Sequence, residues 1–440
     1  MYRTGKDVNM KDRILAALER LHIDEYIITE DQTRSAELFF IKKSLDTRRI
    51  KNNTSYAVTV YRSFDKDEQP MKGSSMVHVY DSMTDAELDK TLSGAYLAAS
   101  FVCNPTYELQ EKTVNEFIEM KSDLQGKTLE ESAKIMADAL FAEDKDGDAF
   151  LNSAELFVNE VTTRIFTSTG IDAGYRKYYV TGEFVAQCKE PQDVETYQGF
   201  RYDSLETEAL KAKVRRTLDY TLARAQAKKA PAAGNYRVII CDSYAKELFE
   251  YYTARSLAPY IYGKYSSFKL GENVQAKTAD GGNTEITGDP LTVSLIASVP
   301  FSDEGTRQID RQLLDKGVLK TYHGGVRFSR YIGAEPTGNY RSIKVAPGTT
   351  SVEEMKKQPY LQVVNFSDFQ MDDFTGHFGG EIRLAFLYDG ETVTPVTGGS
   401  INGSIIEKQA SMQLSTEMQV EDGYEGPLAV CFDDIAVAGE

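Results

Sequence analysis

The residues in this 440-residue chain with the most obvious capacity for chemistry are four histidines and a few acidic clusters. His22, His78, His323 and His377 lie far apart, and none is within four residues of another. A zinc protease of the helical type needs two His on one helical face and a Glu that activates water. No H-E-x-x-H or H-E-x-x-x-H segment occurs, which excludes a zinc site carried by one helix. A site assembled from distant residues, such as His323, His377 and a carboxylate, stays open.

An acidic loop at residues 144–155 resembles the calcium loop of an EF-hand. It places acidic residues at positions 1, 3, 5 and 12, with Asn at position 9. Position 6, where the loop turns sharply and calls for Gly, is Ala149. The following segment, 156–166, alternates and is rich in β-branched residues, whereas an EF-hand needs a helix there. The pattern favours an acidic surface turn that enters a β-hairpin, with a calcium site as the alternative.

Other candidates rest on single residues. Asp303 and Glu304 are adjacent carboxylates that could form an acid–base pair, but neighbours in a strand or turn point apart, which favours a structural role. His323 and His377 fall in expected loops, where contact with a bound peptide is the alternative to a hydrogen-bonded structural role. The sequence has no G-x-S-x-G nucleophile turn and no G-x-x-x-x-G-K-[ST] phosphate loop.

Tyrosines are concentrated in one short stretch. Five of them lie within residues 251–265, beginning with Tyr251 and Tyr252. Tyrosine is favoured at interfaces because its ring is apolar and its hydroxyl is polar. The stretch suits contact with a partner subunit or the lining of a channel, and ordinary packing is the competing interpretation.

Composition narrows the class of protein. Apolar residues make up 41% and charged residues 27% of the chain, which is typical of a globular protein with an ample core. The net charge of -17, without a Lys/Arg-rich block of note, argues against direct nucleic-acid binding. No segment approaches the apolar length of a membrane-spanning helix, and the N-terminus does not read as a secretory signal. We expect a cytoplasmic protein. Its four scattered cysteines are expected to be small buried hydrophobes.

The elements that would position these residues indicate an α+β fold in three parts. Residues 1–105 form a mixed domain with two helices and several strands. The helices are expected at 11–21 and from a capping box at Thr84 and Glu87 to about residue 102, and the strands at 25–29, 36–42, 55–61 and 76–80.

The remaining two parts differ in the helices and strands that we expect. Residues 106–230 are expected to hold a capped helix from Thr128 to about residue 141, a hairpin over 156–188 and a long helix over about 205–228. Residues 231–440 begin with a strand and a helix, 236–241 and 243–257. They continue as short strands with Gly-rich turns, so this domain is expected to be mostly β.

An ordered series of short motifs runs through the last part of the chain. The segments are F-S-D-E-G at 301–305, D-K-G-V-L-K at 315–320, P-T-G-N at 336–339, F-T-G-H-F at 374–378, Y-D-G-E-T-V-T-P-V at 388–396, I-N-G-S at 401–404 and D-D-I-A-V-A-G at 433–439. This series resembles the C-terminal domain of the TldD/PmbA family, also called modulator of DNA gyrase. The resemblance covers residues 235–440 well and extends to residues 11–230 in domain order.

The resemblance implies a two-subunit metalloprotease that processes unfolded peptides, in which one subunit carries zinc. The zinc-bearing TldD type has H-E-x-x-x-H on the helix after the first strand of this domain, and a G-x-C-G-K segment near its C-terminus. The corresponding helix here, 243–257, contains no His, and no G-x-C-G-K segment occurs. The chain is therefore similar to the PmbA/TldE-type subunit. It is expected to hold no metal itself, with zinc in a TldD-type partner.

Two other functions stay open from the sequence. One is a peptide-binding or regulatory homodimer without catalytic assembly. The other is a hydrolase with an unrecognised metal site. Both the non-metal subunit and the homodimer would need residues that contact a substrate or a partner. The candidates are His323, His377, Asp303, Glu304, Tyr251 and Tyr252.

Overall fold

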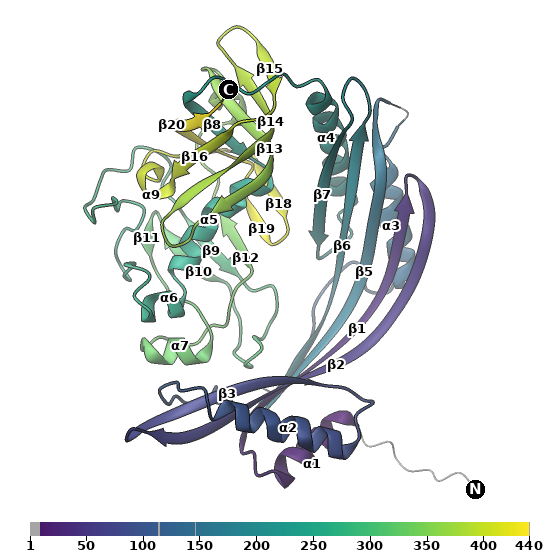
Figure 1. Ribbon diagram of the computed structural model, residues 1–440, viewed down its shortest axis with the longest axis vertical. Helices are drawn as coiled ribbons and strands as arrows, with labels where there is room; N and C mark the ends of the chain where they lie inside the picture. Colours follow the sequence, from purple (N-terminus) through teal and green to yellow (C-terminus); the bar gives the residue numbers. More distant parts are fainter. Residues whose placement is uncertain (1–8, 113–114, 146, 440) are drawn as a thin grey trace.

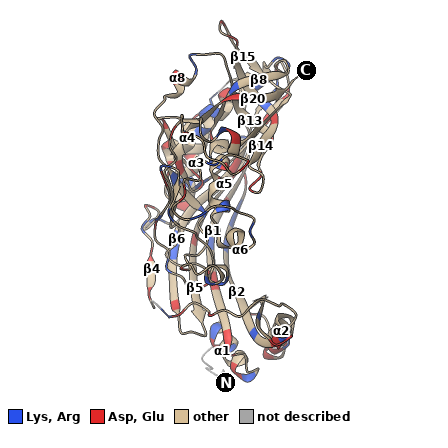
Figure 2. Ribbon diagram, turned by 90° about the vertical axis from the view of Figure 1, so that its left-hand side faces the viewer, with Lys and Arg blue, Asp and Glu red and all other residues tan. Residues whose placement is uncertain are grey.

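The computed structural model describes residues 9–112, 115–145 and 147–439. They form an α+β fold in which one long, curved sheet faces a strand-rich C-terminal region (Figure 1). No helix in these ranges is long and apolar enough to cross a membrane. Lys/Arg and Asp/Glu are interspersed along the molecule rather than separated onto two faces (Figure 2).

The long N-terminal sheet has the strand order β3-β2-β1-β5-β6-β4. Strand β7 also pairs with β6, along a different part of that strand from β4. The strands of the sheet are β1 (Glu25–Ile41), β2 (Ser44–Lys66), β3 (Gln69–Val79), β4 (Phe117–Glu119), β5 (Ala149–Thr167), β6 (Asp172–Cys188) and β7 (Val194–Tyr202). Strand β1 pairs with β5 from Ile27 to Ile41, so one sheet joins strands from both sides of the boundary expected near residue 105.

Strand β1 corrects one sequence prediction. Residues 25–29 and 36–42 were expected as two strands, and they are the ends of a single strand. The polar stretch between them is extended because it is paired on both sides, with β2 and with β5. Cross-strand contacts hold its polar side chains. Asp31 accepts a hydrogen bond from the Thr163 hydroxyl, and Arg34 pairs with Glu160 at 3.3 Å.

Four helices cover this sheet in two pairs: α1 (Met10–Arg20), α2 (Asp85–Ala99), α3 (Leu129–Phe141) and α4 (Thr207–Ala225). Ile14 and Leu18 of α1 and Leu88 and Leu92 of α2 are buried in one core with β1 and β2. A second core joins α3 and α4 to the opposite end of the sheet. The predicted helix periodicity is confirmed.

Both predicted capping boxes are confirmed. The Thr84 hydroxyl accepts from the Glu87 amide at 3.3 Å, and the Glu87 carboxylate accepts from the Thr84 amide at 2.8 Å. The same reciprocal pair joins Thr128 and Glu131 at the start of α3. Each box satisfies amides that a helix N-terminus otherwise leaves without a partner.

The acidic loop before β5 leads into a strand. Ala149–Thr167 is extended, so the helix that follows an EF-hand loop is absent at this position. Asp146 lies outside the described residues. Asp144 is buried, and its carboxylate lies 3.8 Å from the Lys43 ammonium. The acidic turn entering a hairpin is the arrangement found for the described part of this loop.

The C-terminal region contains two sheets and several short helices. One sheet has the order β11-β10-β9-β12-β19-β18. Its strands are β9 (Val293–Ile296), β10 (Arg311–Asp315), β11 (Val318–Leu319), β12 (Ser342–Val345), β18 (Met418–Glu421) and β19 (Tyr424–Pro427).

The other C-terminal sheet closes on itself. Its order is β13-β8-β20-β16-β14-β15, β17 pairs with β20, and β13 also pairs with β14, which completes a ring. Its strands are β8 (Gly234–Cys241), β13 (Tyr360–Met371), β14 (His377–Tyr388), β15 (Val393–Val396), β16 (Ser400–Ser404), β17 (Gln413–Leu414) and β20 (Ala429–Ala438). The helices of the region are α5 (Ser243–Arg255), α6 (Ala258–Tyr262), α7 (Val326–Tyr331), α8 (Val352–Met355) and α9 (Ile405–Lys408). Helix α5 packs into a core shared by both sheets.

Candidate functional site

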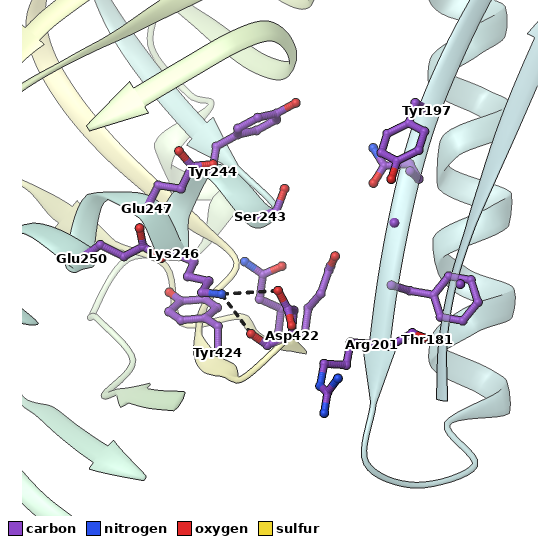
Figure 3. A pocket seen from close by; sticks show the side chains of 16 residues that line it. Thr181, Tyr197, Arg201, Ser243, Tyr244, Lys246, Glu247, Glu250, Asp422 and Tyr424 are labelled. Carbon is purple, nitrogen blue, oxygen red and sulfur yellow. Dashed lines mark hydrogen bonds and ion pairs between the residues drawn. The ribbon is translucent and has the colours of Figure 1, made fainter. Parts of the chain in front are cut away.

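A cleft lies between the N-terminal sheet and the C-terminal region, with a volume of about 640 Å³. One wall comes from β6 and β7, and the opposite wall from the first two turns of α5 together with β18 and β19 (Figure 3). The lining residues are Thr181, Gly182, Tyr197, Gln198, Gly199, Phe200, Arg201, Ser243, Tyr244, Lys246, Glu247, Glu250, Gln419, Glu421, Asp422 and Tyr424. The two walls are far apart in sequence, so this site exists only in the folded chain.

The first wall is the end strand of a sheet. Among the described residues, β7 pairs with β6 alone, so its other edge has no strand neighbour. An edge strand presents unpaired backbone amides and carbonyls, which can bond another extended chain. Gly199 keeps the middle of this wall open, since a Cβ there would approach nothing closer than the Tyr197 hydroxyl at 3.5 Å. Strand β7 can therefore accept an extended peptide through its backbone.

The second wall is fixed where β8 turns into α5. Asp242 occupies this turn at φ 59° and ψ −140°, a conformation that costs a non-glycine residue free energy unless the surroundings hold it. Its carboxylate lies 3.2 Å from Arg216 of α4 and accepts a hydrogen bond from Tyr220. The Gln419 side chain of β18 donates to its backbone carbonyl at 2.7 Å. Contacts from α4 and β18 therefore determine where α5 starts.

Charge on the α5 wall is predominantly acidic. Lys246 is engaged with Asp422, donating to its carbonyl at 2.9 Å and lying 3.5 Å from its carboxylate. Burial, together with the neighbouring Glu250, raises the pKa of Glu247 to about 7. Burial also raises the pKa of Glu250. The wall can thus hold a proton or a positively charged group at neutral pH.

A buried ion pair joins the two sides of the cleft. The Lys213 ammonium of α4 bonds the Glu421 carboxylate of β18, and both side chains are largely buried. On the facing wall, Arg201 stacks its guanidinium 3.9 Å from the centre of the Tyr179 ring and lies 3.8 Å from Asp203. These contacts hold charged side chains in defined positions at the cleft.

His323 is a structural residue. It is 3% exposed, and its Nε2 bonds the carbonyl of Thr253 in α5 at 2.9 Å. Burial lowers the pKa of His323 to about 4, so the ring is neutral at pH 7 and Nε2 donates the hydrogen. Its backbone bonds Ser256 and Ala258, which fixes the end of α5. The cleft is lined by the other end of this helix, so His323 does not reach it.

The other histidine and the acidic pair lie apart from the cleft and from one another. His377 is exposed at the start of β14, opposite Ser404 of β16. Asp303 is exposed, whereas Glu304 is half-buried and accepts from the Val326 amide at 2.7 Å. Burial raises the pKa of Glu304. Among the described residues, these side chains do not form one constellation.

Tyr251 and Tyr252 correct the interface interpretation. They are 2% and 0% exposed, in the core with Phe268, so neither can touch a partner or a substrate. The Tyr252 hydroxyl donates to Gln409 at 2.9 Å. Later tyrosines of the same stretch are accessible, and Tyr265, 60% exposed, packs against Phe374 at 5.6 Å between ring centres.

The cleft residues that matter most were missed from the sequence. Glu247 and Glu250 lie in the helix examined for histidines, and their spacing of three residues puts both on one helical face. That spacing was the sequence signal from which an acidic helical face could have been predicted. Strand β7 gave no comparable signal, because the free edge follows from sheet order and not from the residues of the strand.

With this geometry established, comparison with known proteins identifies the domain that contributes α5. Residues 233–439 match the model of the PmbA/TldA metallopeptidase C-terminal domain. This C-terminal domain belongs to the TldD/PmbA family. The resemblance seen in the short motifs is thereby confirmed.

Solved structures of the family share the fold over nearly the whole chain. TldE from Thermococcus kodakarensis superposes with a TM-score of 0.75 at 16% identity, covering 98% of this chain and 100% of that one. A candidate modulator of a DNA gyrase from Thermotoga maritima MSB8 gives 0.75 at 17% identity, covering 97% and 99%. At such identities the likeness shows the shared fold.

A curated relative matches part of the chain. The metalloprotease TldD homolog of Buchnera aphidicola is 27% identical over 154 residues, which is 31% of this chain and 31% of that protein. The chain therefore spans about a third of the length of that relative.

The zinc ion that the family name implies does not fit the α5 wall. Zinc in proteases is held by His together with carboxylate or Cys ligands. The cleft lining offers Glu247 and Glu250 with the ammonium of Lys246, and neither His nor Cys. Within the described ranges, no group of three or more His, Cys, Asp or Glu is placed to hold a metal ion.

Proposed function

We propose that this chain binds an extended peptide in the cleft and works as the non-metal subunit of a two-subunit metalloprotease. The observation that carries the proposal is the free edge of β7, which lines a cleft of about 640 Å³ opposite α5. Ligand sites usually measure about 300–1,000 Å³, so this volume suits a short peptide segment. Strand addition uses backbone hydrogen bonds, which accept many sequences and therefore suit unfolded substrates.

The zinc would come from a TldD-type partner. The helix that carries the zinc ligands in that type corresponds to α5 here, which has no His. The likeness to a solved TldE supports a role as the partner of a TldD-type subunit. In this arrangement the present chain holds the peptide, and the partner cleaves it.

Co-expression with a TldD-type protein that contains H-E-x-x-x-H tests the assignment. We expect a stable complex that hydrolyses unfolded peptides, with neither chain active alone. Absence of both association and proteolysis would refute the proposal. If this chain instead forms a homodimer that binds peptide without hydrolysis, as light scattering and a binding assay would show, a regulatory role replaces it.

The cleft itself is tested by filling it. Gly199→Phe adds a ring to the β7 wall, where a Cβ meets no backbone atom closer than 3.9 Å, so the sheet is expected to persist. Peptide binding should fall sharply, while association with the partner is retained. Gly94→Phe on the exposed face of α2, where a Cβ meets nothing within 4 Å, is the matched control. Unchanged peptide binding by the Gly199 variant would place the peptide elsewhere.

A further inference from the structure

A second free strand edge lies at the opposite side of the N-terminal sheet from β7. Strand β2 pairs with β1 along its length, but β3 joins it only from Tyr56 onward. In the part of the chain that the structure describes, residues 44–55 of β2 therefore have no strand on their outer side. We call this segment the basic edge. It ends at the hairpin between β1 and β2, on the outer side of the molecule (Figure 1).

The basic edge concentrates positive charge in an acidic protein. Residues 42–51, which include the hairpin turn before the edge, contain five Lys or Arg and one Asp, whereas the whole chain carries -17. Arg49 bonds Glu37, and Lys43 lies 3.8 Å from Asp144. Arg48 and Lys51 have no ion pair within the described residues. These cations lie within ten consecutive residues, so the chain does contain a short basic block, contrary to the interpretation of its charge above.

Large apolar side chains are exposed on the basic edge and beside it. Leu45 is 50% and Ile50 is 56% exposed, and Ile41, at the end of β1, is 60% exposed. Charged side chains and bulges are common devices that protect an edge strand, and this edge has both, with cations and a register shift where Phe39 and Phe40 face Thr47 and Leu45. Here every residue from 41 to 53 is exposed. The exposed aliphatic side chains are what set this edge apart from one that is only protected.

The pairing register puts the apolar side chains on one face of the edge, together with Arg48 opposite Leu38, and the other cations on the opposite face. Ile50 lies opposite Ala36, and Leu45 opposite Phe40, on the face where Phe40 packs against Phe141 of α3. Arg49 lies opposite Glu37 on the other face, and side chains alternate along a strand, so Lys51 joins it there. A strand added beside the basic edge would meet Leu45, Arg48 and Ile50 on one face, and Arg49 and Lys51 on the other.

We infer that the basic edge is a docking site for an extended, acidic segment of a partner polypeptide, which adds as a strand with alternating apolar and acidic residues. The apolar residues would pack beside Leu45 and Ile50, and the acidic ones would face Arg49 and Lys51. Opposite charges in cross-strand pairs stabilise a sheet, whereas like charges destabilise it. A second copy of this chain pairing through the same edge would bring cations against cations, so charge excludes self-association there.

Nucleic acid suits this surface less well. Nucleic-acid binding rests on many phosphate contacts with basic groups, and the net charge of -17 repels phosphate backbones. Two of the five cations are already beside carboxylates. The exposed backbone edge with Leu45 and Ile50 favours a polypeptide strand.

The test uses the full chain and a fluorescent peptide of alternating Val and Glu. Binding is followed by anisotropy, and hydrogen exchange locates the amides that the peptide protects. We expect protection in residues 44–55 and binding that weakens as salt is added. Arg49→Glu with Lys51→Glu should weaken binding about tenfold or more, because two favourable pairs become repulsive. Lys134→Glu with Lys357→Glu makes the same change of charge at exposed positions in α3 and in the turn after α8, and should leave binding within about twofold.

Four results would overturn the inference. A peptide of alternating Val and Lys could bind as well as the acidic one, which would remove the role of charge. Protection could fall on β7 instead, which would assign the peptide to the cleft of the proposed function. A single-stranded oligonucleotide could protect residues 44–55 where the acidic peptide does not, which would make this a nucleic-acid surface. Ile50→Thr, which keeps strand propensity, should weaken the acidic peptide, and an unchanged affinity would also contradict the model of strand addition.

Discussion

Replacing Glu247 by Gln tests the electrostatics of the cleft wall. The pKa of this carboxyl rises from 4.5 to about 7, chiefly because it is half-buried and next because Glu250 is nearby. Between pH 4.5 and pH 7 the folded protein therefore holds a proton that the unfolded chain has released. The contribution of this group to stability is fully present below about pH 4.5 and is lost as the pH rises through 7.

The expected change in the free energy of unfolding depends on the size of the pKa shift and on how far the Glu247 side chain is exposed. One pKa unit is worth about 1.4 kcal/mol, so a fully buried group with this shift would cost about 3 kcal/mol above pH 7. Glu247 is only half-buried and solvent screens its charge, which reduces the expected cost to about 1 kcal/mol. Gln keeps the shape of the side chain and does not ionise, so Glu247→Gln should remove this cost.

Urea unfolding followed by far-UV circular dichroism, from about pH 4.5 to about pH 8, measures the difference. The free energy of unfolding of the variant, minus that of the parent, should rise by about 1 kcal/mol across this window and then level off. Glu407→Gln changes an exposed carboxylate of α9 in the same way and serves as the control. A difference for Glu247→Gln that is flat with pH would refute the assignment of a proton to this wall.

Two further substitutions test a helix cap away from the cleft and the ion pair beside it. Thr84→Ala removes the side chain that caps α2 and should lower the free energy of unfolding by about 1 kcal/mol, measured by urea unfolding. An unchanged midpoint would show that the cap is dispensable. Glu421→Ala leaves the ammonium of Lys213 buried without its partner and should cost about 3 kcal/mol in the same assay. Lys213→Met combined with Glu421→Leu should recover most of that loss, and failure to recover would mean that packing, and not charge, dominates there.

Local patterns predicted the longer helices and several of the N-terminal strands. The two capping boxes, the stripe on α1 and the hairpin of β5 and β6 were all predicted from spacing, because each depends on residues close in the chain. The prediction was wrong where distant partners decide. Residues 30–35 are polar and would suit a loop, yet they are extended because two neighbouring strands supply their hydrogen bonds.

The cleft could be predicted only in part. The motifs predicted the family of the C-terminal domain, and the helix 243–257 was predicted close to its observed bounds. The face of that helix that lines the cleft is determined by contacts between residues near 200, 245 and 420. These residues are far apart in the chain, so no local pattern encodes their contacts. The tyrosine stretch left two interpretations for a related reason: its composition suits both core and interface, and only packing separates buried Tyr252 from exposed Tyr265.

Helix α4 explains how two separate walls keep a fixed spacing. It packs against β6 and β7 on one side and touches β14 and β15 on the other. Its Lys213 holds Glu421 of β18, and its Arg216 and Tyr220 hold Asp242 at the start of α5. The strained backbone of Asp242 persists because these contacts determine it from two elements. A cleft whose walls are tied through one helix is formed before a ligand arrives, which lowers the conformational cost of binding a chain that is itself unfolded.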